Sequence, residues 1–80
     1  MKKVLLNRIS TDPNVCFGRA CIRGHRIWVS VVLDMLAEGL SVNQILEEFP
    51  QLEAEDILAC IAYAAELSRE RFVELHQETA

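Results

Sequence analysis

The stretch RACIRGHRIWVS, residues 19–30, decides the fold because the sequence pattern changes at its end. Before it, apolar residues come in short clusters separated by turn-forming residues such as the DPN of residues 12–14, which predicts short strands and turns. Within it, Gly24 suits the positive φ angle of a tight turn. The sequence therefore predicts a β-hairpin in which residues 20–22 pair with residues 26–28.

After Trp28 the apolar spacing becomes helical. Four residues fall on one helix face: Val32, Leu33, Leu36 and Leu40. Gly39 stands where a helix end takes a left-handed residue, so we predict a first helix over residues 30–38. Ser41 and Gln44 then have the spacing of a capping box, which predicts a second helix over residues 42–48.

A third helix is predicted to follow Leu52, because the next residues are acidic and suit the positive end of a helix dipole. No Gly or Pro interrupts the chain beyond that point, so this helix is expected to run for about 24 residues. Its apolar residues recur at coiled-coil spacing: Leu58, Ile61, Ala65, Phe72 and Leu75. Two short helices cannot cover such a length, so its far end is expected to need another partner.

Size and composition indicate one domain over residues 1–80, with a β-containing part (1–29) and a helical part (30–80). The chain has 80 residues, 51% of them hydrophobic and 25% charged, which is typical of a small globular domain. A domain of this size buries a modest core, so a homodimer is expected to stabilise it. Without an export signal or a membrane-spanning apolar run, we expect a cytoplasmic protein with reduced cysteines.

Charge is distributed unevenly along the chain. Residues 1–28 hold six basic residues and one acidic residue, whereas residues 29–80 hold two arginines and eleven acidic residues. Such an asymmetry indicates either a basic half that faces an anion or two halves that meet each other, within one chain or across subunits.

Neither a metal site nor a catalytic site is predicted. Cys16, Cys21 and His25 have C-x4-C-x3-H spacing without the C-x2-C pairs of structural zinc sites, and Cys60 lies in an apolar helix as a core thiol would. The chain also lacks the motifs of nucleophilic, phosphate-binding and metal-dependent enzymes. We therefore expect no cofactor and no enzymatic activity.

Anion binding is the remaining chemistry that the residues suggest. The break between the first two helices and the following prolyl turn are compatible with a helix-turn-helix. The acidic start of the third helix would repel DNA, so Arg19, Arg23 and Arg26 would have to make most contacts with phosphates. In the alternative, the same arginines bond to acidic residues of a partner subunit or another protein.

Several ordered motifs together resemble the family known as domain of unknown function 433. The family pattern has an I-x-x-D-P opening, a G-[KR]-x-x-I-x-G-x-R-[IV] segment, a helix ending in A-x-G, an S-x-x-[EQ]-I-L helix, an aromatic-proline turn and an acidic helix start. The matching residues are 9–13 (ISTDP), 18–27 (GRACIRGHRI), 37–39 (AEG), 41–46 (SVNQIL), 49–52 (FPQL) and 55–57 (EDI). Glu53 departs from the usual Ser or Thr, which predicts a weaker helix cap.

The resemblance implies a mainly α fold: a three-helix, homeodomain-like helix-turn-helix core with a small N-terminal β-hairpin and a long C-terminal helix. Members of the family are regarded as antitoxins, similar in role to VapB-type antitoxins and paired with a PIN-like nuclease toxin. Dimerisation and binding to operator DNA are the associated expectations.

Our hypothesis at this point is a non-enzymatic antitoxin that neutralises such a toxin and represses its own operon. Polar contacts to nucleic acid are assigned to Arg19, Arg23, His25 and Arg26, and packing against the toxin or a second subunit to Leu67, Phe72 and Leu75. The alternative is a protein-interaction module that dimerises through its C-terminal helix and does not bind DNA.

Overall fold

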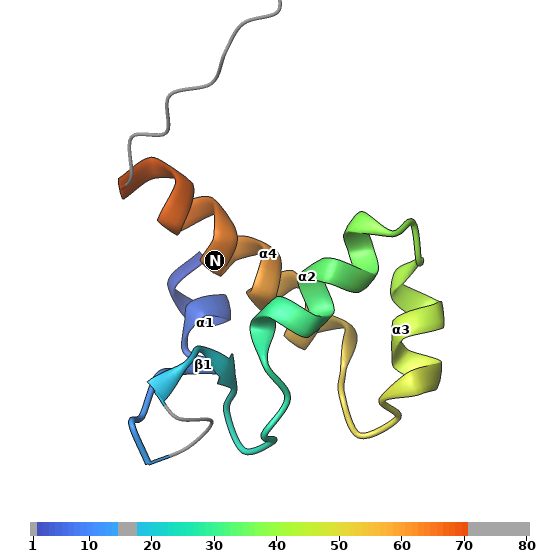
Figure 1. Ribbon diagram of the computed structural model, residues 1–80, viewed down its shortest axis with the longest axis horizontal. Helices are drawn as coiled ribbons and strands as arrows, with labels where there is room; N and C mark the ends of the chain where they lie inside the picture. Colours follow the sequence, from blue (N-terminus) through green and yellow to red (C-terminus); the bar gives the residue numbers. More distant parts are fainter. Residues whose placement is uncertain (1, 15–17, 71–80) are drawn as a thin grey trace, which may run out of the picture.

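The computed structural model describes residues 2–14 and 18–70, and they form a mainly helical fold with a small two-stranded sheet (Figure 1). The elements are α1 (Lys2–Leu6), β1 (Ile9–Ser10), β2 (Cys21–Ile22), α2 (Val29–Ala37), α3 (Val42–Glu48) and α4 (Ala54–Glu70). The predicted combination of helices with a small β element is confirmed. None of the helices in the described part is long and apolar enough to cross a membrane.

The first element, α1, is a helix, whereas the sequence predicted only strands and turns before residue 29. That prediction was wrong for this segment. Lys2–Leu6 form a short helix that packs beside α4 (Figure 1). An isolated helix of this length is unstable in water, so its packing must supply the stability. Leu5 packs against the core and provides that contact. Five residues are too few for a helical period to be visible in the sequence.

The sheet joins two strands that are distant in sequence. β1 and β2 are antiparallel, with Ile9 opposite Ile22 and Ser10 opposite Cys21. The strand at Cys21–Ile22 was predicted, but its partner was expected at residues 26–28. Ile9 and Ile22 are both buried, so this pairing brings two core residues together and connects the N-terminal segment to the helices.

The predicted hairpin turn is present in a shorter form. Gly24 has a φ of +86°, as the turn requires. The amide of Ile22 donates to the carbonyl of Ile27 at 2.9 Å, and a single bridge links Cys21 with Trp28. Residues 26–28 form no strand because the chain turns directly into α2.

The ends of α2 and α3 follow the sequence closely. Gly39, two residues after the end of α2, has a φ of +97°. The amide of Leu40 donates to the carbonyl of Met35 at 3.1 Å, which is the pattern of a Schellman motif. At the start of α3, the Gln44 amide donates to Ser41 Oγ at 3.1 Å and the Ser41 amide to Gln44 Oε1 at 2.8 Å. The predicted helix end and capping box are confirmed.

The core lies where the sheet and α2, α3 and α4 meet, and its largest fully buried side chains are Ile22, Val32, Ile45 and Ile57. Helix α4 contributes Ile57 and Cys60 to it, whereas Leu58 and Ile61 face solvent. The predicted apolar stripe that begins at Leu58 therefore lies on the outer face of α4. This helix is apolar on two sides, and residue spacing alone does not show which side meets the core. Phe72 and Leu75 lie outside the described residues.

Candidate functional site: the arginine-rich hairpin and its surroundings

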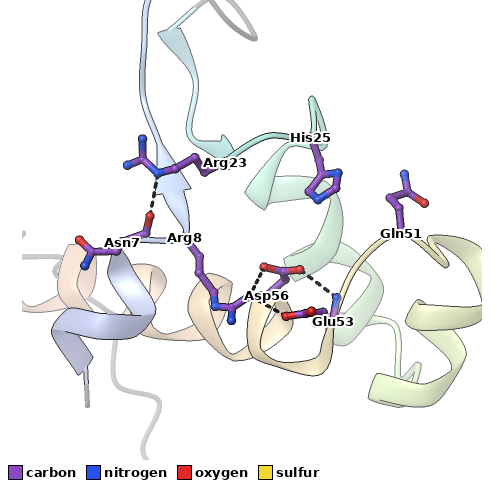
Figure 2. A pocket seen from close by; sticks show the side chains of 7 residues that line it. All are labelled: Asn7, Arg8, Arg23, His25, Gln51, Glu53 and Asp56. Carbon is purple, nitrogen blue, oxygen red and sulfur yellow. Dashed lines mark hydrogen bonds and ion pairs between the residues drawn. The ribbon is translucent and has the colours of Figure 1, made fainter.

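Arg23 is directed at the backbone of the N-terminal segment. Its Nε donates to the carbonyl of Asn7 at 2.7 Å (Figure 2), and Nη2 donates to the carbonyl of Ile9 at 2.9 Å. The Arg23 amide also donates to the carbonyl of Arg8 at 2.7 Å. Three donors of one residue thus hold the segment that links α1 to β1. The Arg23 guanidinium has a structural role here.

Arg8, which was not among the predicted site residues, joins the N-terminal segment to the start of α4. Its Nη1 lies 3.0 Å from Asp56 Oδ1 and 3.1 Å from Glu53 Oε1 (Figure 2). The hydrogen bonds to Asp56 and then to Glu53 raise the pKa of Arg8 above its ordinary value. The charge asymmetry of the sequence was the signal for this contact: the basic and acidic halves meet within one chain.

Asp56 also caps α4. Its Oδ2 accepts a 2.8 Å hydrogen bond from the Glu53 amide, while its Oδ1 accepts from Arg8. This is the returning bond of a capping box, supplied without a Ser or Thr at the cap position. The Asp56 side chain is only 8% exposed, and both of its bonds are partly buried. Glu53 pairs with Arg8 in place of capping the helix.

His25 lies beside this cluster. Its amide donates to the Ile22 carbonyl at 2.9 Å, which holds the turn, and its half-buried side chain points toward Asp56 and Gln51 (Figure 2). The hollow between these elements has a volume of about 330 Å³. Its lining residues are Asn7, Arg8, Arg23, His25, Gln51, Glu53 and Asp56. Within this hollow, Arg8 forms ion pairs with Asp56 and Glu53 of the same chain.

Arg19 and Arg26 are both exposed at the surface. The Arg19 guanidinium carbon lies 4.8 Å from the centre of the Trp28 ring, a cation–π contact. Arg26 borders a second hollow of about 270 Å³ that we call the hairpin hollow; it is lined by Arg26, Ile27, Trp28, Val31 and Phe49. Neither arginine pairs with a carboxylate among the residues that the structure describes. Of the four residues predicted to contact nucleic acid, Arg23 bonds to the N-terminal backbone and His25 lies beside the Arg8 cluster. We call the other two, Arg19 and Arg26, the outer pair.

Leu67 lies at the other end of the molecule, where α1 and β1 meet α4. It is 39% exposed and lines a hollow of about 360 Å³, which we call the Leu67 hollow. The other lining residues are Leu6, Ile9, Thr11, Tyr63 and Glu66. The lining of this hollow combines apolar side chains with the polar Thr11 and Glu66.

The cysteines behave as core residues. Cys21 and Cys60 are buried, and burial followed by the charge of Asp56 raises the pKa of Cys60 to about 12. Within residues 2–14 and 18–70, no three His, Cys, Asp or Glu side chains gather as metal ligands would. Cys16 of the considered zinc pattern lies outside the described residues.

Comparison with known proteins identifies relatives but no activity. A family model described as "Protein of unknown function (DUF433)" matches residues 9–64. The uncharacterized protein y4eO of Sinorhizobium fredii (strain NBRC 101917 / NGR234) is 36% identical over 56 residues, which is 70% of this chain. The match spans 25% of that protein's length. No solved structure matches the chain significantly.

Proposed function

We propose, because the chain belongs to the DUF433 family, that it is the antitoxin of a type II toxin–antitoxin system and neutralises a PIN-like nuclease in the cytoplasm. The ordered motifs of residues 9–57 support this proposal through the family that they resemble. The protein acts by binding, and no catalytic step is assigned to it. The homeodomain-like arrangement of α2, α3 and α4 is part of the same proposal.

The observation that carries the binding role is the Leu67 hollow. It combines an exposed leucine with the half-buried side chains of Leu6 and Tyr63 at a point where three elements meet, and Thr11 and Glu66 add polar groups to its lining. Interfaces obtain most of their affinity from such buried apolar anchors. We propose that the toxin covers this hollow, with Phe72 and Leu75 of the following segment extending the contact.

Co-expression with the product of the adjacent gene tests the antitoxin role. The expected results are growth rescue in cells that express the nuclease and a stable complex on size-exclusion chromatography. Leu67→Asp should abolish both, because a carboxylate cannot be buried without a partner. Leu58→Asp is the matched control, since Leu58 is also exposed but lies outside this hollow. A toxin complex that tolerates Leu67→Asp would contradict the proposed surface, and absence of any complex would contradict the function.

Binding to operator DNA is the second candidate, and the outer pair Arg19 and Arg26 favours it, because both are exposed and unpaired with acids in the described part of the chain. His25 would add a contact only if it turned outward. Fluorescence anisotropy with promoter DNA at several salt concentrations measures the affinity of the protein for DNA. Replacement of both arginines by alanine should weaken binding and lower its salt dependence.

A protein-interaction module without DNA affinity, dimerising through its C-terminal helix, is the alternative. It is favoured by the acidic start of α4, where Glu53, Glu55 and Asp56 would repel a polyanion. It is also favoured by Arg23, whose guanidinium is occupied by backbone carbonyls. Absence of DNA binding at low salt, together with an intact toxin complex, would select this alternative.

A further inference from the structure

Two exposed apolar surfaces have no role in the toxin contact proposed above. One is the hairpin hollow, where Val31 is 40% exposed beside the half-buried rings of Trp28 and Phe49. Arg26 borders this hollow, and Arg19 covers one face of the Trp28 ring. It is therefore an apolar depression flanked by two positive charges.

The second surface is the outer face of α4, which we define by Glu55, Leu58 and Ile61. These residues are three positions apart, so they lie on one side of the helix. Leu58 is 49% exposed and Ile61 is 44% exposed, although both are large and apolar. Glu55 is exposed one turn before Leu58 and gives this face a negative end.

The two surfaces are complementary in both charge and polarity. Large apolar side chains beside a carboxylate would meet an apolar depression beside two guanidinium groups. We propose that a second copy of this chain docks the outer face of its α4 into the hairpin hollow, with Leu58 against Trp28 and Val31 and with Glu55 beside Arg26. The contact would cover three of the large apolar side chains that a single copy leaves exposed: Val31, Leu58 and Ile61.

The hairpin hollow fits a protein better than DNA. DNA phosphates need positive charge but gain nothing from the apolar walls that line most of this hollow. A second copy is the appropriate protein because this chain carries both surfaces. When two copies exchange this contact reciprocally about a two-fold axis, the interface is isologous and closes a dimer. None of the residues named in this contact lines the Leu67 hollow. The proposed dimer therefore goes beyond the proposed antitoxin role and does not depend on that role.

Charge reversal in the full-length protein tests the contact by analytical ultracentrifugation over a range of concentrations. Arg26→Glu and Glu55→Arg should each weaken self-association by about tenfold or more, because each brings like charges together. The double variant should regain most of the lost affinity. An equimolar mixture of the two single variants should also associate, because one contact is then native and the other has its charges exchanged.

Glu38→Arg is the control, since it makes the same change of charge as Glu55→Arg at an exposed position at the end of α2. It should leave self-association unchanged. Leu58→Asp should abolish association while retaining the helical circular dichroism of the wild type, because Leu58 is not part of the core.

Three results would overturn the proposal. The first is a monomer at all concentrations up to about 1 mM, the weakest association of practical relevance. The second is a dimer that neither charge reversal weakens, as dimerisation through another part of α4 would give. The third is an Arg26→Glu variant that loses DNA binding and keeps its self-association, which would assign the hollow to DNA.

Discussion

Two pairs of arginines in the basic N-terminal part have opposite roles. Arg8 and Arg23, which we call the inward pair, bond within the chain, to the start of α4 and to the backbone of Asn7 and Ile9. Arg19 and Arg26 face outward, one over the Trp28 ring and the other at the edge of the hairpin hollow. The difference shows that two arginines of the basic segment bond within the fold, whereas Arg19 and Arg26 remain available for the contacts proposed above.

The inward pair compensates for the short elements that it connects. α1 has five residues and β1 has two, so neither is stable alone. Arg23 satisfies backbone carbonyls that so short a sheet leaves unpaired, and Arg8 ties the same segment to α4. Arg19 and Arg26 make no such bonds to the backbone or to α4. Substitution of either should therefore change the proposed binding and leave the fold intact.

The largest effect is expected from Asp56→Ala, which removes the acceptor of both the Arg8 bond and the Glu53 amide bond. We expect the free energy of unfolding to fall by about 2–3 kcal/mol, measured by urea denaturation with circular dichroism. Asp56→Asn can still accept from the amide and should lose about half as much. Equal losses for Asp56→Ala and Asp56→Asn would show that the bond to the Glu53 amide contributes little. A loss below about 0.5 kcal/mol for Asp56→Ala would show that the cluster of Arg8, Glu53 and Asp56 does not stabilise the fold.

A smaller loss is expected from Arg23→Ala. It leaves the carbonyls of Asn7 and Ile9 without their side-chain donors, which should cost about 1–2 kcal/mol in the same denaturation experiment. Arg23→Lys should recover little, because an ammonium group cannot reproduce the two-pronged donation. Arg26→Ala is the matched control from the outward pair and should stay within about 0.5 kcal/mol of the wild type. Equal losses for Arg23→Ala and Arg26→Ala would abolish the distinction between the pairs.

The helical half was predictable because its signals are local. Gly39 ends α2 through its own backbone angle, and Ser41 and Gln44 cap α3 across a single turn. The partner of β2 was not predictable in this way. It lies at Ile9–Ser10, and the register depends on the burial of Ile9 against Ile22, a contact between distant residues.

The division of the arginines was beyond a sequence-based prediction for the same reason. Arg23 and Arg26 are three residues apart on either side of the Gly24 turn, and only the fold sends one toward β1 and the other to the surface. The charge asymmetry indicated either a basic half that faces an anion or two halves that meet, and it did not single out Arg8. Likewise, the spacing of Leu58 and Ile61 showed an apolar stripe without showing that a second stripe, at Ile57 and Cys60, takes the core.

The buried thiol of Cys60 makes the free energy of unfolding depend on pH. Its pKa is raised from 9.0 to about 12 in the folded protein, so the folded state favours the neutral thiol. This contribution is complete below pH 9 and is lost as the pH rises, because the unfolded chain then releases the proton first. Between pH 8 and pH 10, the wild type should lose about 1 kcal/mol more stability than Cys60→Ala. Parallel pH profiles for the two proteins would contradict the raised pKa.

The smallest effect is expected at the outer pair itself. Arg19→Ala removes the cation–π contact with Trp28 and should cost about 0.5 kcal/mol, measured at a low protein concentration so that self-association does not contribute. Trp28 is the one tryptophan of the chain, so its fluorescence reports the contact directly. Arg19→Ala should change the emission of Trp28, whereas Arg19→Lys should retain much of the native signal because it keeps a cation over the ring. Emission that is the same in all three proteins would show that Arg19 does not hold the ring in solution, and the hairpin hollow would then have one positive charge fewer to offer a partner.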